Sequence, residues 1–195
     1  MNLVELRNYD NAWYDPGGSF LKRALWMLLG QPCFASRWLP GSGLRVRLLR
    51  AFGARIGRGV VIKPAVKVKY PWHLDIGEDS WIGEECWIDN LTTVRIGSNA
   101  CLSQGAYLCT GNHDWSDPKF GLRIASIQLG EGAWAGAKSV LTPGTILGAY
   151  AIAAAGAVVG GRIPDFQVFA GNPAQYVRTR QIQQTRVSVH EVMPS

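Results

Sequence analysis

His113 is the residue of this 195-residue chain best suited to chemistry near neutral pH. It lies in the segment from Thr110 to Pro118, which reads TGNHDWSDP. Because an imidazole exchanges a proton close to pH 7, His113 is a candidate general base, and Asp114 or Asp117 could orient its ring. The alternative is a structural histidine that hydrogen-bonds its own turn, and spacing alone does not decide between the two.

A six-residue repeat indicates the element that must position His113. Each repeat has an apolar residue, a small or turn-tolerant residue after it, and a second small residue four places after it. The apolar positions are Leu129, Ala135, Leu141, Leu147, Ala153 and Val159. A helix repeats every 3.6 residues and a half-buried strand every 2, so a period of six requires short strands joined by tight corners. We therefore predict an all-β fold, a parallel β-helix with three hexapeptides in each triangular coil.

The same register continues upstream in three runs of apolar residues. The runs are Ile56, Ile62 and Val68; Ile76, Ile82 and Ile88; and Ile96, Leu102 and Leu108. Consecutive runs are separated by eight residues, which predicts that two residues bulge out at a corner. Between Leu108 and Leu129 about fifteen residues must leave the coil, and solenoids commonly carry function on such insertions. We predict an inserted loop at 111–126 with His113 at its root.

Three parts are expected: an N-terminal capping segment (1–50), the β-helix (51–164) and a C-terminal tail (165–195). The stretch from Ser19 to Leu29 predicts a short helix with Ser19 as its N-cap and Phe20, Ala24, Leu25 and Leu28 on one face. We expect a helical cap over the open edge of the first coil, because solenoid ends must be covered. The other interpretation is peripheral contact with a membrane, suggested by Trp13, Trp26, Trp38, Arg37, Arg45 and Arg47.

Composition narrows the classes of partner. The net charge is +6, and residues 1–55 hold eight basic residues against three acidic ones. A basic flank suits a phosphorylated ligand or an anionic surface, whereas nucleic acid is disfavoured because no reader motif or aromatic and basic stripe is present. The apolar stretch from Phe20 to Leu39 is interrupted by charges, so we expect neither a membrane span nor a cleavable signal but a cytoplasmic protein. The cysteines, none in a Cys-x-x-Cys pair, are expected to be reduced: Cys33, Cys86, Cys101 and Cys109.

The repeats, the TGNH loop and the sequence AGNPA at 170–174 together resemble the left-handed β-helix acyltransferases that take an acetyl group from acetyl-CoA. The chain is similar in particular to the WcaF-like acetyltransferases of colanic acid biosynthesis, which are related to the maltose and galactoside O-acetyltransferases. The resemblance covers nearly the whole chain, including LRAFGA at 49–54, PW at 71–72, WIDN at 87–90 and the segment 109–118.

This resemblance implies a homotrimer with active sites between neighbouring subunits, acetyl-CoA as the acyl donor, a sugar or glycan-precursor hydroxyl as the acceptor, and no metal. It also implies a left-handed coil, which periodicity cannot show. His113 matches the family's general base, and Asp114 and Trp115 of the same loop are expected to bind substrate. The pantetheine arm is expected to pass the small residues Gly136, Ala137, Ala154 and Ala155, with Arg178 and Arg180 near the 3′-phosphate of CoA.

The chain departs from the sugar acetyltransferases at two places. Gly160 and Gly161 stand where many relatives have Thr-Lys, which removes one expected cation from the cofactor site. The asparagine that contacts the acceptor in the galactoside enzymes falls on Gly83, so Asp89 and Asn90 are the substitutes that we expect to contact the acceptor.

Three alternatives stay open at the level of sequence. The acceptor could be an antibiotic hydroxyl or a serine. A γ-class carbonic anhydrase uses the same coil but needs three zinc-binding histidines, and this chain has only His73, His113 and His190. A solenoid that serves as a non-catalytic scaffold would have no use for His113 as a base.

Overall fold

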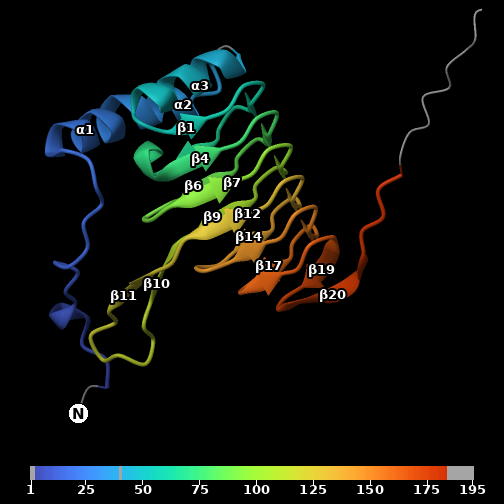
Figure 1. Ribbon diagram of the computed structural model, residues 1–195. Coiled ribbons are helices and arrows are strands. Elements are labelled where there is room, and N and C mark those ends of the chain that lie inside the picture. Colours follow the sequence, from blue (N-terminus) through green and yellow to red (C-terminus); the bar gives the residue numbers. More distant parts are fainter. Residues whose placement is uncertain (1–2, 40, 184–195) are drawn as a thin grey trace, which may run out of the picture.

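The structure, a computed structural model, describes residues 3–39 and 41–183 and is dominated by short parallel strands stacked in coils (Figure 1). Each complete coil contributes one strand to each of three sheets. The first sheet contains β1 (Arg55–Ile56), β4 (Leu74–Ile76), β7 (Val94–Ile96), β12 (Ile127–Leu129), β15 (Ile146–Leu147) and β18 (Arg162–Ile163). The second contains β2 (Val61–Ile62), β5 (Trp81–Ile82), β8 (Cys101–Leu102), β13 (Trp134–Ala135), β16 (Ile152–Ala153), β19 (Gln167–Gly171) and β20 (Ala174–Thr179). The third contains β3 (Lys67–Val68), β6 (Trp87–Asp89), β9 (Tyr107–Cys109), β14 (Val140–Leu141) and β17 (Val158–Val159). The predicted parallel β-helix of hexapeptide repeats is confirmed.

The apolar positions of the repeat form the core of the coils. Every one of the fifteen predicted inward residues is buried, with Ile56 the most accessible at 8%. Equivalent residues pair from coil to coil, as Ile76 does with Ile96 and Leu129 with Leu147. The small position of the repeat is buried too, and Cys86 fills it in the second coil as an apolar group. The six-residue period therefore identifies the residues that hold successive coils in register.

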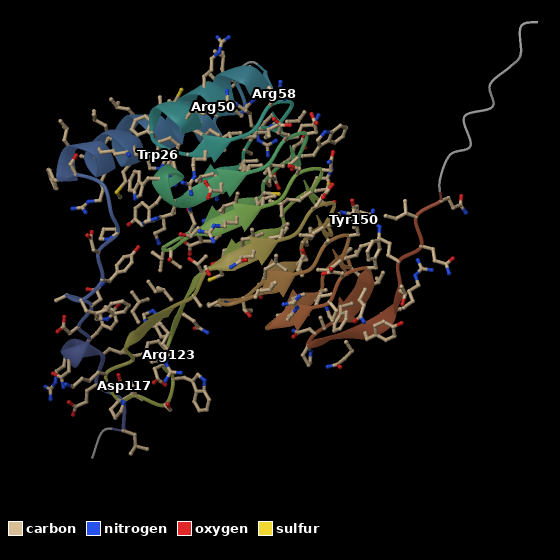
Figure 2. All side chains as sticks on the ribbon, viewed as in Figure 1. Trp26, Arg50, Arg58, Asp117, Arg123 and Tyr150 are labelled. Atoms are coloured by element: carbon tan, nitrogen blue, oxygen red, sulfur yellow. The ribbon has the colours of Figure 1, made fainter. Side chains whose placement is uncertain are left out.

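The N-terminal helices cover the first coil. They are α1 (Phe20–Leu25), a π-helical turn η2 (Trp26–Gly30), α2 (Gln31–Ala35) and α3 (Ser42–Ala51). Ser19 is the N-cap of α1, and its hydroxyl accepts a hydrogen bond from the backbone N–H of Lys22. Trp26 points from these helices to the first coil (Figure 2) and donates its indole N–H to the carbonyl of Val68 at 3.2 Å. Together with Phe34 it is fully buried, so the predicted helical cap is confirmed.

Two details of the cap prediction are wrong. Phe20, Leu25 and Leu28, expected on one face of a covering helix, are exposed, because the residues that face the coil are Trp26 and Phe34. Phe20 and Leu25 lie in α1, which buries none of its residues, and the change to π-helical winding at η2 alters the phase of the helix only from Trp26 onward. Arg45 and Trp26, named as candidates for membrane contact, are buried instead.

The two corners with eight-residue spacing differ in structure from the six-residue corners. A 3₁₀ turn, η3 (Pro71–His73), accommodates the extra residues before β4. At the equivalent corner of the second coil, the chain from Asn90 to Thr93 forms the bulge before β7. At the same corner of the third coil, the chain leaves the solenoid altogether after Thr110 and returns at Ile127. One edge of the solenoid therefore carries all the insertions.

The C-terminal tail begins as a further rung of the solenoid. β19 pairs in parallel with β16, and β20 folds back antiparallel on β19, so the segment expected to be a tail extends the second sheet. The remainder of that predicted tail, 184–195, lies outside the described residues. None of the helices in the described part of the chain has the length and apolar character needed to cross a membrane.

Candidate active site

The inserted loop is a β-hairpin that projects from the solenoid (Figure 1). Its strands, β10 (Gly111–His113) and β11 (Leu122–Ile124), pair antiparallel, with His113 opposite Leu122. At the tip, Asp117 accepts hydrogen bonds from the backbone N–H groups of Lys119 and Gly121. His113 is therefore held on a strand at the point where the hairpin begins to turn.

The imidazole of His113 is fixed by the hairpin's own backbone and by two aromatic rings. Its Nδ1 lies 2.8 Å from the carbonyl oxygen of Phe120. Because a carbonyl can only accept, Nδ1 carries the proton and Nε2 keeps its lone pair. The Phe120 ring stacks on the imidazole with centroids 4.7 Å apart, and Tyr9 meets it edge-on at 5.6 Å. Within the described residues Nε2 has no hydrogen-bond partner, so this nitrogen is available to accept a proton.

The prediction that Asp114 or Asp117 orients the ring is wrong, since the carbonyl of Phe120 does so. Asp114 instead accepts hydrogen bonds from Ser116 and pairs with Arg123 of β11. The Ser116 hydroxyl, and then its backbone N–H and the nearby guanidinium, lower the pKa of Asp114. The carboxylate therefore braces the hairpin.

An open pocket of about 590 Å³ lies between the hairpin and the coil below it. Its lining consists of Asn112, His113, Trp115, Arg123, Ile124, Ala125, Thr142 and Pro143. Trp115 is 83% exposed there, and Figure 2 shows Arg123 on the hairpin with Asp117 at its tip. The pocket thus combines a base, an exposed aromatic ring and a cation at one edge of the solenoid.

The N-terminal segment runs along the same edge of the solenoid and reaches the hairpin, which sequence reasoning missed. Its contacts, in chain order, are the backbone N–H of Glu5 to Pro118 O at 2.8 Å, the Tyr9 ring to His113, the Tyr14 hydroxyl to Leu91 O at 2.7 Å, and Pro16 O from the Trp72 indole N–H at 2.7 Å. These contacts fall on the bulged corners of successive coils. The eight-residue spacings were the only signal in the sequence for an attachment along this edge.

Asp89 and Asn90 occupy different environments. Asn90 is fully buried, and its side-chain amide accepts from Tyr70 N at 3.0 Å and donates to Tyr70 O at 2.7 Å. This pairing holds the second and first coils together at the bulged corner, and burial leaves the amide inaccessible to an acceptor. Asp89 lies on the outer face of β6, where Lys69 Nζ approaches to 3.1 Å and the Tyr107 hydroxyl to 3.4 Å. Of the pair, only Asp89 stays a candidate for substrate contact.

The four small residues predicted to line the pantetheine path do lie together. Gly136, Ala137, Ala154 and Ala155 form one corner of two successive coils, where Gly136 N donates to Ala153 O at 2.7 Å. A Cβ on Gly136 would come within 2.6 Å of Ala155 N, so the coils touch through backbone there. Gly83 occupies the same corner two coils earlier, and a Cβ on it would come within 2.8 Å of Gln104 N.

Arg178 and Arg180 are not at that corner. Arg178 lies on β20 opposite Val168. Arg180 donates to the carbonyl oxygens of Gly132 at 2.9 Å and Tyr150 at 3.2 Å, which precede the strands of the second sheet, whereas the small residues follow them. The two arginines share a pocket of about 550 Å³ with Thr179 and Gln181. Arg180 therefore lies at the opposite end of the second sheet's strands from the small residues and is already engaged by backbone, whereas Arg178 lies on β20 beside Val168.

Histidine, cysteine and acidic side chains do not gather into a group of three anywhere in residues 3–39 and 41–183. His73 lies 3.0 Å from Pro16 O through its Nε2, and His190 lies outside the described residues. The four cysteines are free thiols, and only Cys86 among them is buried. Burial raises the pKa of Cys86 to about 12.

Comparison with known proteins gives a consistent family. No family model matches the chain. It is 37% identical to the putative colanic acid biosynthesis acetyltransferase WcaF of Escherichia coli K12 over 166 residues, which cover 84% of this chain and 90% of that protein. A solved galactoside acetyltransferase in complex with coenzyme A is similar at 25% identity and a TM-score of 0.73, covering 83% of this chain and 82% of that one. A hexapeptide-repeat acetyltransferase from Vibrio cholerae shares the fold at 20% identity and a TM-score of 0.75, covering 85% of this chain and 96% of that one.

The 37% identity to WcaF over 84% of the chain agrees with the stacked hexapeptide coils of the structure. The chain belongs to the WcaF-like branch of the hexapeptide-repeat acetyltransferases.

Proposed function

We propose that this protein transfers an acetyl group from acetyl-CoA to a hydroxyl of a sugar, within the biosynthesis of an exopolysaccharide or another surface polysaccharide. The observation that carries the proposal is His113, whose Nδ1 is tied to the carbonyl of Phe120 at 2.8 Å while Nε2 is left with its lone pair. The similarity to WcaF supports the polysaccharide role, and the CoA complex of the galactoside enzyme supports the donor.

In the proposed reaction, Nε2 of His113 takes the proton of the acceptor hydroxyl as its oxygen attacks the thioester carbonyl. The C–S bond of the tetrahedral intermediate then breaks, and the departing thiolate receives the proton from the imidazolium. No covalent acyl-enzyme forms. Backbone N–H groups at coil corners are the proposed donors to the oxyanion.

The remaining proposed roles are assigned from the pocket beside His113 and from the coil corner at Gly136. Trp115 offers an exposed aromatic face to the acceptor, and Asp89 is the proposed polar contact on the neighbouring coil. The backbone corner at Gly136 and Ala154 has no long side chains to obstruct an extended pantetheine arm. Arg178 is the proposed partner of a CoA phosphate, as a charge-assisted contact.

We further propose a homotrimer that acts in the cytoplasm. Trp81 and Trp134 lie on the outer face of the second sheet and are 58% and 42% exposed, which favours an additional protein contact there. The four free thiols suit a reducing compartment. Light scattering tests the assembly and should give three times the chain mass of 21.3 kDa.

The test of function is release of free CoA from acetyl-CoA with a panel of sugars, and with serine and an aminoglycoside as competing acceptors. His113→Ala should lower the rate ~10²- to 10⁴-fold, the usual effect of losing a general base. Lys119→Ala is the matched control, because Lys119 is an exposed residue of the same hairpin and is not one of the residues that line the pocket. Full activity in His113→Ala, or no CoA binding and no CoA release with any acceptor, would refute the proposal.

A further inference from the structure

The outer surface of the N-terminal cap is apolar even though the inner face of the cap already packs against the first coil. Six side chains of α1 and η2, each between 42% and 79% exposed, form this surface, hereafter the cap surface: Phe20, Leu21, Leu25, Met27, Leu28 and Leu29. The same helical stretch buries Trp26 and Phe34 against the first coil. The exposure therefore does not reflect a helix that has lost its core contacts. It is a second apolar face, and exposed apolar clusters of this kind often mark an interaction site.

The charges around the cap surface are mainly positive, although the exposed Asp15 lies 4.0 Å from Arg23. From residue 16 to residue 54 the chain has six basic residues and no acidic one. Three of them are engaged within the fold, Arg37 by Glu85, Arg45 by the carbonyls of Gly41 and Ser36, and Arg50 by the carbonyl of Ile56. Lys22 and Arg23 lie within α1 itself, and Arg47 is exposed on α3. A partner of this surface must bind apolar side chains and must also carry negative charge.

Two tryptophans flank the cap surface. Trp13, in the segment before α1, is 60% exposed, and Trp38, after α2, is 93% exposed. Tryptophan is favoured at the boundary between water and lipid, where its ring is apolar and its N–H can reach polar groups. The arrangement is that of an interfacial amphipathic helix with aliphatic residues on one side and cations beside them.

We propose that the cap surface docks on an anionic lipid bilayer, with α1 and η2 lying along its plane. A second copy of this chain fits the surface less well, because the pairing would bring the cations of two caps together with few acidic residues, such as Asp15, to compensate them. Anionic headgroups supply the missing negative charge, and the acyl boundary receives Phe20, Leu21 and Leu28. Each exposed cation near such a surface adds attraction that falls with salt.

Docking in this way has a consequence for the acceptor. The N-terminal segment leads from α1 along one edge of the solenoid to the hairpin that carries His113, so the cap surface and the pocket are connected along that edge (Figure 1). In Figure 1 the hairpin lies at the far end of this edge from α1, so a glycan precursor held in the membrane by a lipid would have to extend along the edge to reach the hairpin. This consequence rests on the proposed function, whereas docking itself does not.

The test is flotation of the full chain with vesicles of phosphatidylethanolamine and phosphatidylglycerol, compared with vesicles of phosphatidylcholine alone. The wild-type protein should float with the anionic vesicles, and raising the salt should weaken the binding. The double variant Leu21→Glu/Leu28→Glu should reduce partitioning by roughly a hundredfold or more, since each buried leucine contributes about tenfold. Val177→Glu is the matched control, because Val177 is exposed on β20, far along the chain and at the other end of the solenoid (Figure 1).

Circular dichroism melting shows whether each variant folds, and Leu21→Ser/Leu28→Ser replaces the glutamate pair if that pair does not. The proposal is overturned if the wild-type protein fails to float, if it binds phosphatidylcholine equally well, or if the folded double variant binds as the wild type does. It is also overturned if the double variant has a smaller mass by light scattering, because the cap surface would then be a protein interface. None of these measurements uses acetyl transfer, so a failed acceptor screen leaves the result intact.

Discussion

Replacing Gly97 by alanine should destabilise the protein, because the backbone of the next coil occupies the space that a Cβ would need. A Cβ on Gly97 would lie 2.7 Å from Glu131 N, 2.7 Å from Gly130 C and 2.9 Å from Gly130 O. An ordinary contact needs about 3.4 Å, so the coils would have to separate by about 0.7 Å. The hydrogen bond from Gly97 N to Leu129 O, now 2.8 Å, would be stretched to its limit.

The expected loss combines overpacking, about 1–3 kcal/mol, with a weakened buried hydrogen bond, about 0.5–1.5 kcal/mol. The reduced entropy of the unfolded chain returns about 0.4–1 kcal/mol. The free energy of unfolding should therefore fall by about 2–3 kcal/mol, and the melting temperature by roughly 5–10 °C. Urea unfolding at fixed protein concentration measures the first quantity, with an unchanged slope as the sign that the native state is otherwise intact.

Gly160 provides the matched control. It occupies the same position of the hexapeptide in the last complete coil, and the nearest atom to a Cβ there is the Thr142 hydroxyl at 3.2 Å. Gly160→Ala should therefore leave the free energy of unfolding unchanged or raise it by up to about 1 kcal/mol. If both substitutions cost the same, or if Gly97→Ala costs less than about 0.5 kcal/mol, the close approach of coils is not what selects glycine at this position.

Three further outcomes are expected. Tyr9→Ala should lower the rate of CoA release up to about tenfold, because the edge contact of the Tyr9 ring with His113 is lost and such an aromatic pair contributes about 0.5–1.5 kcal/mol. Tyr9→Phe keeps the ring, so its rate should stay within about twofold of the wild type. Steady-state kinetics on both variants decides whether the ring or the hydroxyl matters. Asn90→Ala should reduce the free energy of unfolding by about 2–4 kcal/mol, since it leaves two buried groups of Tyr70 without partners, but the KM for the acceptor in the folded protein should not change; an altered KM would restore Asn90 to the acceptor site. Cys86, whose pKa burial raises from 9.0 to about 12, stabilises the fold fully below pH 9 and progressively less as the pH rises toward 12; in native protein at pH 8, mass spectrometry should find this thiol unalkylated by iodoacetamide until urea is added.

The sequence was most informative where a periodic constraint acts on every coil. Each inward residue from Ile56 to Val159 could be assigned because a solenoid buries the same position of every hexapeptide. The hairpin was found as an interruption of that period, and His113 followed from it. The N-cap at Ser19 could also be predicted, since it depends only on neighbouring residues.

Features that depend on contacts between distant backbone groups could not be predicted from the sequence pattern. The group that orients His113 is the carbonyl of Phe120, and a carbonyl carries no residue-type signal. Asn90 was predicted to contact the acceptor because nothing in its sequence neighbourhood shows that Tyr70 of the previous coil uses its amide. The inward face of the cap was misassigned for a related reason, since Trp26 faces the coil through a hydrogen bond to the backbone carbonyl of Val68, 42 residues along the chain.

The attachment of the N-terminal segment to the hairpin also sets an order of events during synthesis. The hydrogen bond from Glu5 to Pro118 joins residues 113 positions apart. A ribosome adding 5–20 residues per second needs roughly 6–20 s to make the intervening chain. Glu5 therefore reaches its native place long after it is synthesised, once the coils that the N-terminal segment crosses have been built. A protein fused before this segment would have to wait for the same time before the segment docks. It would then be held beside the hairpin that carries His113.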